Sequence, residues 1–145
     1  MAMKILAFVV LALLSIAGQT ELVKFSVSSF IMPDKNLSMQ LDVVVPSEKG
    51  NYPTIVFITG VAGMTPAVFQ QQLIDSVASK DYAWITVRLC FIKVTKLQSP
   101  KPTKVTSAFS LVMDWITQNI QAAVNGHGSH ATLDLDDRLV LIGHS

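Results

Sequence analysis

The last three residues of the chain, Gly143-His144-Ser145, are the strongest candidates for chemistry. They directly follow Leu139-Val140-Leu141-Ile142, an apolar run typical of a buried strand. A serine in this setting begins the Gly-x-Ser-x-Gly pattern, in which a sharp strand-to-helix turn presents the hydroxyl above the edge of a sheet. The sequence therefore predicts that Ser145 is a nucleophile, and the alternative is that the same serine caps a helix after a strand.

The other side chains that could react or bind a metal do not form a recognised site. Asp134, Asp136 and Asp137 lack the glycine and the terminal glutamate of a calcium loop, so we expect them to turn the chain and cap the entry to a strand. The single cysteine, Cys90, excludes an intrachain disulfide framework and a multi-cysteine zinc site. It is predicted to be either a small buried apolar residue or half of a disulfide whose partner is absent here. The sequence thus predicts no metal site.

The elements that position these residues begin with strands of two kinds. Residues 22–29 and 37–45 alternate apolar and polar side chains, a pattern that indicates strands with one buried face. Turn residues lie between them in Pro33-Asp34-Lys35-Asn36, so a hairpin is expected. Continuous apolar runs, which indicate strands buried on both faces of a parallel sheet, occur at 55–58, 82–87 and 139–142.

Two helices are predicted between the buried strands. Thr65-Pro66 offers an N-cap and a first-turn proline, and an apolar face continues to Ser79. A second apolar face begins at Val105, and Asn125-Gly126 ends that helix. This order gives an α/β fold, with a hairpin followed by a parallel βαβαβ sheet covered on both faces. The remaining segments are expected to be connections, at 46–53, 89–103 and 127–138.

The segment 1–17 is predicted to be a secretory signal peptide, which leaves a domain of residues 18–145. It begins with a positive charge at Lys4, and its apolar run, roughly 20 Å long as a helix, is too short for a hydrocarbon core of about 30 Å. Small residues precede a cleavage site after Ala17 or Gly18. We therefore expect a secreted protein with a glycosylation acceptor at Asn36. The alternative is an uncleaved segment that tethers the domain to a membrane.

The composition outside this segment is that of a soluble globular domain. The 145 residues are 50% hydrophobic, and residues 1–17 hold a disproportionate share of them. Apart from Lys4, the chain has 10 basic and 10 acidic residues. This balance excludes a basic nucleic-acid-binding surface and a disordered polyelectrolyte.

These features resemble the α/β-hydrolase superfamily. The order of elements matches from the hairpin through the third buried strand, and segments 53–60 and 136–145 are similar to small secreted esterases. Chlorophyllases, platelet-activating-factor acetylhydrolases and polyester hydrolases belong to that branch. The resemblance implies that Ser145 is the nucleophile of an elbow that includes Gly143 and His144.

The resemblance also implies an oxyanion hole in the loop 60–64. In this family, one backbone N–H from this loop and one from the residue after the serine stabilise the charge on the carbonyl oxygen. Val61 is the implied donor and Ala62 its neighbour. Thr59 stands where histidine is common in the family, although this change leaves the backbone donor in place. The alternative is an ordinary βα turn that contains glycine.

The resemblance implies a serine-dependent carboxylic ester hydrolase that forms an acyl-enzyme at Ser145 and needs no cofactor or metal. The triad acid and base follow the serine in this family, so His127 and His130 are expected to be solvated loop residues. We therefore expect the 145 residues to be the N-terminal half of the domain, as a fragment or an incomplete gene product. The implied partner is a small-molecule or lipid-like ester, without nucleic acid or a stable membrane span. The alternative is an inactive binding or adhesion module with the same fold.

Overall fold

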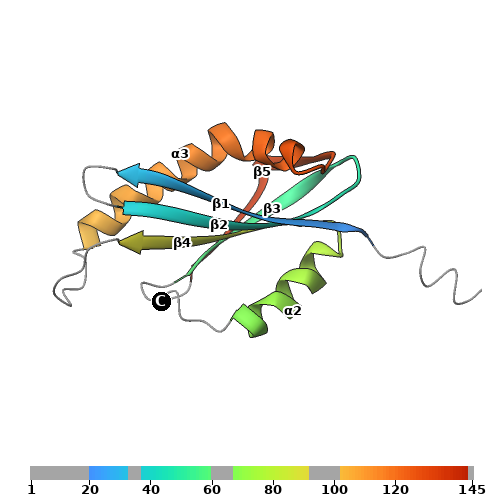
Figure 1. The fold of residues 1–145 in the computed structure, drawn as a ribbon, viewed down its shortest axis with the longest axis horizontal. Helices are drawn as coiled ribbons and strands as arrows, with labels where there is room; N and C mark the ends of the chain where they lie inside the picture. The colour runs from blue at the N-terminus through green and yellow to red at the C-terminus, as the bar shows by residue number, and fades with distance from the viewer. Residues whose placement is uncertain (1–19, 33–36, 60–66, 92–101, 144–145) are drawn as a thin grey trace, which may run out of the picture.

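The computed structural model describes the backbone of residues 20–32, 37–59, 67–91 and 102–143, and the side chains of all these except 67–69, 91 and 102–106 (Figure 1). These residues form one sheet and two helices. The strands and helices in chain order are β1 (Leu22–Met32), β2 (Leu37–Pro46), β3 (Gly50–Ile58), α2 (Ala67–Ala78), β4 (Ala83–Phe91), α3 (Pro102–Gly126) and β5 (Ala131–Gly143).

The sheet has the strand order β1-β2-β4-β3-β5. The predicted hairpin is confirmed, because β1 and β2 pair as antiparallel neighbours from Leu22 opposite Pro46 to Phe30 opposite Ser38. β4 pairs with β2 in the antiparallel direction, whereas β3 is parallel to both β4 and β5. The two helices lie on opposite faces of the sheet (Figure 1). The chain therefore has the predicted α/β architecture, with a mixed sheet and a parallel part formed by its last three strands.

Each helix covers its own apolar layer because the strands alternate their side chains between the two faces. The α3 side contains the larger core, in which Val112, Ile116, Ile120 and Val124 are buried against β2, β3 and β4. These four residues are spaced four apart, so they form one stripe along the helix. On the other face, Ile74 and Ala78 of α2 pack against a smaller cluster of strand residues, namely Val44, Ile55 and Trp84. Within the described residues, neither helix combines the length and the apolar character needed to cross a membrane.

Several predicted boundaries are wrong. β3 begins at Gly50 within the expected turn, β4 continues to Phe91, and α3 begins at Pro102 in the expected irregular connection. α2 ends at Ala78, and its predicted cap at residues 65–66 lies outside the described residues. In β4, the extra residues Leu89 to Phe91 are held by pairing with β2, a contact that local sequence patterns do not report.

The start of β5 is the largest difference from the prediction, because the strand begins at Ala131 instead of Leu139. Residues 131–134 pair with the first residues of β3, and the register then jumps so that Thr54 lies opposite Leu139. Residues 135–138, of which all but Leu135 are charged, form the irregularity between these two paired stretches. They were predicted to be part of a loop because a bulge carries the same polar composition as a loop.

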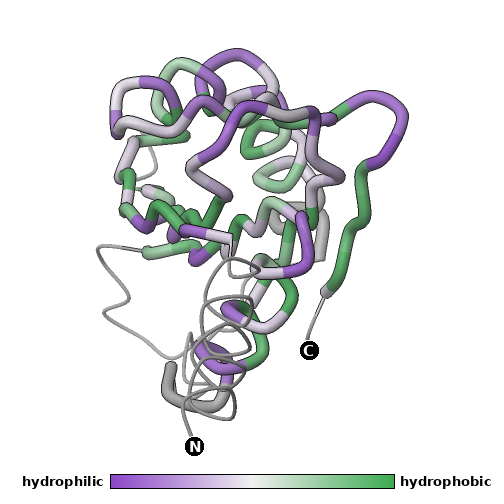
Figure 2. Tube along the Cα trace, turned by 90° about the vertical axis from the view of Figure 1, so that its right-hand side faces the viewer, coloured by the Kyte–Doolittle hydropathy of each residue, from purple (hydrophilic) through white to green (hydrophobic). Residues whose placement is uncertain are grey.

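The predicted burial of β5 on both faces is also wrong. Val140, Leu141 and Ile142 are 46%, 50% and 38% exposed. β5 is the last strand in the sheet order, so within the described residues it has only β3 as a neighbour. Figure 2 shows this apolar stretch, next to the C-terminus, on the outer side of the trace.

Candidate active site

Most of the predicted site residues lie outside the described residues. This holds for the nucleophile Ser145, its neighbour His144, the oxyanion candidates Val61 and Ala62, and the glycosylation acceptor Asn36. Gly143 is described and is the last residue of β5. Among the described residues, no atom lies within 4 Å of the position that a Cβ at Gly143 would occupy.

The sheet register brings the two segments that contain the predicted site to the same edge. Ile58, the last residue of β3, lies directly opposite Gly143, the last residue of β5, in a parallel pairing. Neighbouring strands are about 4.8 Å apart, so the last residues of β3 and β5 lie side by side. In open α/β sheets, ligands bind in the crevice outside the carboxyl ends of the strands.

Thr59, immediately after β3, is anchored to the neighbouring strand by two hydrogen bonds. Its backbone N–H and its side-chain hydroxyl both donate to the carbonyl oxygen of Val87 in β4, each at 3.1 Å. Val87 is itself fully buried in the core on the α3 side. Thr59 is therefore fastened to the sheet through both its backbone and its side chain.

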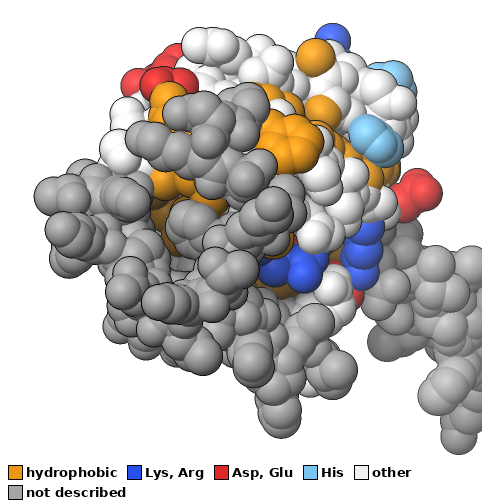
Figure 3. Space-filling model, turned by 60° about the vertical axis from the view of Figure 1, so that its left-hand side comes forward, with side chains coloured by type: hydrophobic (Ala, Val, Ile, Leu, Met, Phe, Trp, Pro, Cys, Tyr) orange, Lys and Arg blue, Asp and Glu red, His pale blue; other side chains and the backbone are white. Residues whose placement is uncertain are grey.

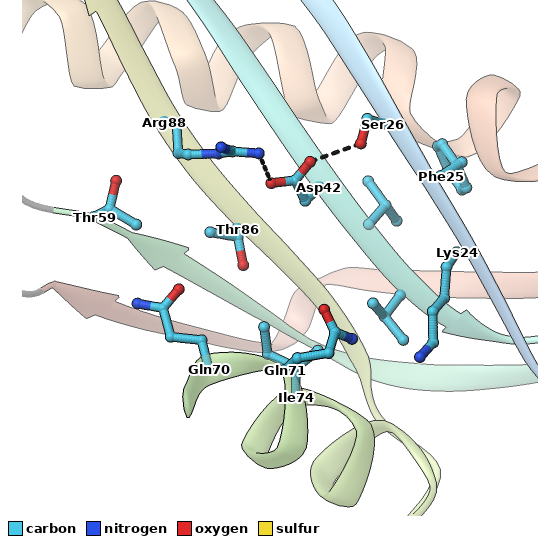
Figure 4. A pocket seen from close by; sticks show the side chains of 12 residues that line it. Lys24, Phe25, Ser26, Asp42, Thr59, Gln70, Gln71, Ile74, Thr86 and Arg88 are labelled. Atoms are coloured by element: carbon cyan, nitrogen blue, oxygen red, sulfur yellow. Dashed lines mark hydrogen bonds and ion pairs between the residues drawn. The ribbon is translucent and has the colours of Figure 1, made fainter. Parts of the chain in front are cut away.

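A polar cavity of about 400 Å³ lies between α2 and the sheet, and Thr59 is part of its lining (Figure 4). On its sheet side, Asp42 of β2 accepts a hydrogen bond from the Ser26 hydroxyl at 2.7 Å and forms an ion pair with Arg88 of β4. Arg88 Nε is buried and has no partner among the described residues. On the helix side, the amide of Gln70 points toward Thr59 and Thr86 (Figure 4).

Sequence analysis did not single out this group of polar residues. Ser26 and Asp42 were read only as the polar positions of alternating strands, and Arg88 lies between the predicted strand 82–87 and the predicted connection 89–103. They meet because Asp42 pairs with Ser26 on one side and with Thr86 on the other. Only the pairing of β2 with β4, which is not sequential, brings Arg88 next to them.

The charges near the cavity are paired rather than concentrated. Lys24 of β1 forms an ion pair with Asp75 of α2 at 2.7 Å. The hydrogen bond from Lys24, assisted by one from Gln71, lowers the pKa of the Asp75 carboxyl below its ordinary value. The face seen in Figure 3 carries both basic and acidic side chains. This distribution agrees with the neutral composition of the domain.

The two loop histidines are exposed, as predicted, and lie far from the candidate site. Both precede β5, so they are at the opposite edge of the sheet from Gly143. His127 is more than a solvated loop residue, because its ring stacks on Phe25 with centroids 4.0 Å apart. Its Nδ1 is also 2.7 Å from the carbonyl oxygen of Ala123 in the last turn of α3.

Asp134 turns the chain as predicted, but it does so at the irregularity inside β5 and not at the entry to the strand. Its carboxylate accepts the backbone N–H groups of Asp137 and Arg138 and forms an ion pair with the Arg138 side chain at 2.7 Å. The hydrogen bond from the Arg138 side chain is the main cause of its lowered pKa. In the part of the chain that the structure describes, no three His, Cys, Asp or Glu side chains are grouped in a way that could hold a metal ion.

Of the two alternatives predicted for Cys90, the small buried residue is wrong, and the disulfide with a partner outside this chain stays a prediction. The side chain is an exposed free thiol. Cys90 lies near the end of β4, opposite Ser38 of β2, whose hydroxyl donates to the Cys90 carbonyl oxygen at 3.4 Å. The thiol is therefore at the surface near the same edge of the sheet as Gly143.

Comparison with known proteins identifies a family and similar folds for this chain. The family model described as Chlorophyllase matches residues 15–145. No curated protein matches the chain. Among solved structures, the chain is similar to esterase Est22, with a TM-score of 0.58, 18% identity, and coverage of 86% of this chain and 35% of the esterase. A structure of Est22 with p-nitrophenol matches with a TM-score of 0.54, 18% identity and the same coverage of both chains. The chain thus spans about a third of the length of that esterase, and its fold is that of the N-terminal third of an α/β-hydrolase esterase.

Proposed function

The chain belongs to the chlorophyllase family, and from this premise we propose that the full-length protein is a serine-dependent carboxylic ester hydrolase with Ser145 as its nucleophile. The observation that carries the proposal is the register of β3 and β5, which puts Ile58 opposite Gly143. The loop 60–64 begins two residues after Ile58, and Ser145 is two residues after Gly143. An ester carbonyl at this edge could meet a hydroxyl from one segment and a backbone N–H from the other.

The proposed reaction proceeds in two steps. A histidine downstream of this chain takes the proton of the Ser145 hydroxyl, and the serine oxygen attacks the carbonyl carbon. The ester C–O bond then breaks, the alcohol leaves with that proton, and an acyl-enzyme remains. Water attacks the acyl-enzyme in the same way and releases the carboxylic acid.

The backbone N–H of Val61 is proposed as one donor to the oxygen that becomes negative in both steps, with Ala62 as its neighbour. Donors held in place before the reaction stabilise this charge without reorganisation, and removing one such donor typically lowers kcat roughly 100- to 1,000-fold. A downstream Asp or Glu would orient the histidine. Gly143 and His144 would complete the elbow around Ser145.

Secretion is part of the same proposal. A cleaved signal peptide at residues 1–17 would place the enzyme outside the cell. The proposed substrates are small-molecule or lipid-like esters. The segment lies outside the described residues, so the proposal rests on its charge, its short apolar run and its small residues near position 17.

Hydrolysis of p-nitrophenyl butyrate by the full-length protein tests the proposal. The wild type is expected to release p-nitrophenol at enzyme-like rates, and Ser145→Ala is expected to lower kcat by at least 1,000-fold while secretion is unchanged. The matched control is Ser110→Ala, which removes an exposed serine of α3. A properly folded wild-type protein that hydrolyses no short-chain ester would leave the binding or adhesion module as the better account.

A further inference from the structure

The cavity between α2 and the sheet has the size of a small-molecule site. Its volume is about 400 Å³, and ligand pockets typically begin at about 300 Å³. The sheet wall includes Val44, Thr86 and Arg88, and the helix wall includes Gln70 and Ile74 (Figure 4). Val44 and Ile74 are buried apolar residues, which suit contact with C–H groups. The polar groups on the two walls indicate what else a ligand would need.

The hydroxyl of Thr86 is a donor without an acceptor among the described residues. Thr86 is only 4% exposed, and its hydroxyl points toward α2 (Figure 4). The indole N–H of Trp84 donates to the Thr86 oxygen at 2.9 Å, and an indole can only donate. Because buried polar groups are nearly always hydrogen-bonded, the Thr86 proton calls for an acceptor in the cavity.

The other polar groups of the cavity offer acceptors as well as donors. The Arg88 guanidinium, which is held by its ion pair with Asp42, presents only N–H donors. The Thr59 oxygen gives its proton to the Val87 carbonyl and keeps lone pairs that can accept. The amide of Gln70, which has no partner among the described residues, can do both. A hydroxyl group also donates and accepts, so a ligand with several hydroxyls matches this mixture better than an anion does.

The charges around the cavity cancel. Both basic side chains of its lining are in ion pairs, Lys24 with Asp75 and Arg88 with Asp42. A charged ligand would therefore lose its hydration without meeting an unpaired opposite charge among the described residues. An uncharged ligand avoids this cost.

We propose that this cavity binds a small uncharged molecule with several hydroxyl groups, of the size of a monosaccharide or smaller. Arg88 and Thr86 donate to its oxygens from the sheet, and Thr59 accepts from one of its hydroxyls. Gln70 binds it from α2. The three sheet-side groups are already held by hydrogen bonds within the protein, so little side-chain freedom is lost when the ligand binds. The proposal does not depend on ester hydrolysis, because these four side chains lie outside the predicted nucleophile elbow.

The indole N–H of Trp84 gives a readout within the site, because it donates to Thr86. In proton–nitrogen correlation spectra of the full-length protein, D-glucose is expected to shift the Trp84 indole resonance, with a Kd on the order of 1 mM. Trp84→Phe assigns that resonance. Trp115 of α3 packs against the core on the opposite face of the sheet, so its indole resonance is expected to stay in place.

Matched sugars test the chemistry of the ligand. D-glucosamine has an ammonium group and D-glucuronate a carboxylate on a ring like that of glucose. Each is expected to bind about fivefold more weakly than glucose or worse, because the cavity has no unpaired charge to offer. Glucuronate or glucosamine that binds as tightly as glucose would overturn the assignment of an uncharged ligand. If neither glucose nor glycerol shifts the Trp84 resonance at up to about 100 mM, the cavity holds water only and the proposal fails.

One substitution on each wall tests the contacts. Gln70→Met keeps the length and the helix propensity of the side chain but removes its amide, and it is expected to raise the Kd roughly three- to tenfold. The matched control is Gln72→Met, an exposed position of α2 outside the lining, where the Kd is expected to stay within about twofold. Arg88→Met removes the donors of the sheet wall and is expected to raise the Kd about tenfold. Equal Kd values for Gln70→Met and Gln72→Met would show that glucose binds elsewhere and would overturn the proposal.

These results are separable from those that test ester hydrolysis. An active esterase whose Trp84 resonance does not respond refutes the cavity site alone, whereas glucose binding by a protein without esterase activity supports the site and refutes only the hydrolase. In an active protein, competition between glucose and p-nitrophenyl butyrate would show that the bound hydroxyls belong to a substrate. Binding without competition would show that they belong to a separate ligand.

Discussion

Gln121 connects α3 to the first half of β5, so replacing it tests how the strand that ends at Gly143 is held. Its side-chain N–H donates to the Ala131 carbonyl oxygen at 2.9 Å, and its Oε1 accepts the Leu133 N–H at 2.9 Å. Ala131 and Leu133 are only 1% and 7% exposed. Water therefore has little access to these two backbone groups when the side chain is changed.

Gln121→Met keeps a long, unbranched side chain with good helix propensity but removes the donor and the acceptor. A buried backbone group left without a partner costs about 1–3 kcal/mol. Gln121 is half-buried, so a little water can reach the site. We therefore assign the lower end of this range, about 1 kcal/mol, to the Ala131 carbonyl and to the Leu133 N–H, which gives about 2 kcal/mol in total. With a urea m-value of about 2 kcal/mol per M, the midpoint is expected to fall by about 1 M.

Urea unfolding of the full-length protein measures this change, and Gln118→Met is the matched control. Gln118 lies one turn earlier on the same helix and is exposed. Its replacement is expected to leave the midpoint unchanged within about 0.2 M, since exposed substitutions of this kind usually alter the free energy of unfolding by less than 0.5 kcal/mol. Equal urea midpoints for the two variants would refute the inference that the hydrogen bonds of Gln121 stabilise the attachment of β5 to α3.

The lowered pKa of Asp134 predicts a pH dependence. Because its folded pKa lies below the unfolded value of about 4, its contribution to stability is present at pH 7 and lost as the pH falls through the folded pKa. The difference in unfolding free energy between the wild type and Asp134→Asn should therefore shrink from pH 7 to pH 3, and a constant difference would contradict this. Residues 18–145 expressed alone should show no esterase turnover and should aggregate through the exposed edge of β5. Leu141→Lys should reduce light scattering, and equal scattering by both proteins would argue against that edge. Secreted protein should begin at Gly18 or Gln19 by N-terminal sequencing, whereas Met1 retained on membrane-bound protein would reverse the prediction of cleavage.

The elements with strong periodicity were predictable from the sequence. The alternation in β1 and β2 reports one buried face for each strand, and the turn residues between them favour a hairpin, which the register confirms. The apolar stripe of α3 was likewise visible, because residues such as Ile116 and Ile120 recur at helical spacing and meet the core. In these elements, the residues that set the local periodicity are also the residues that pack in the core.

What the sequence did not reveal depends on contacts between distant segments. The first half of β5 is a strand because β3 and Gln121 pair with it, although its own residues have the polarity of a loop. Arg88 meets Asp42 only through the pairing of β2 with β4. The two hydrogen bonds of Thr59 to Val87 also depend on the strand order, which local sequence patterns do not report.

The most direct test of the account is covalent labelling of the full-length protein with a fluorophosphonate, followed by peptide mass spectrometry. An elbow presents its serine to the probe, and an adjacent base makes the hydroxyl reactive, whereas a serine that only caps a helix has neither property. We predict that the label is found on Ser145, and that Ser145→Ala abolishes it. A folded protein that takes up no label, or takes it up at another residue, would contradict the assignment of Ser145 as the nucleophile.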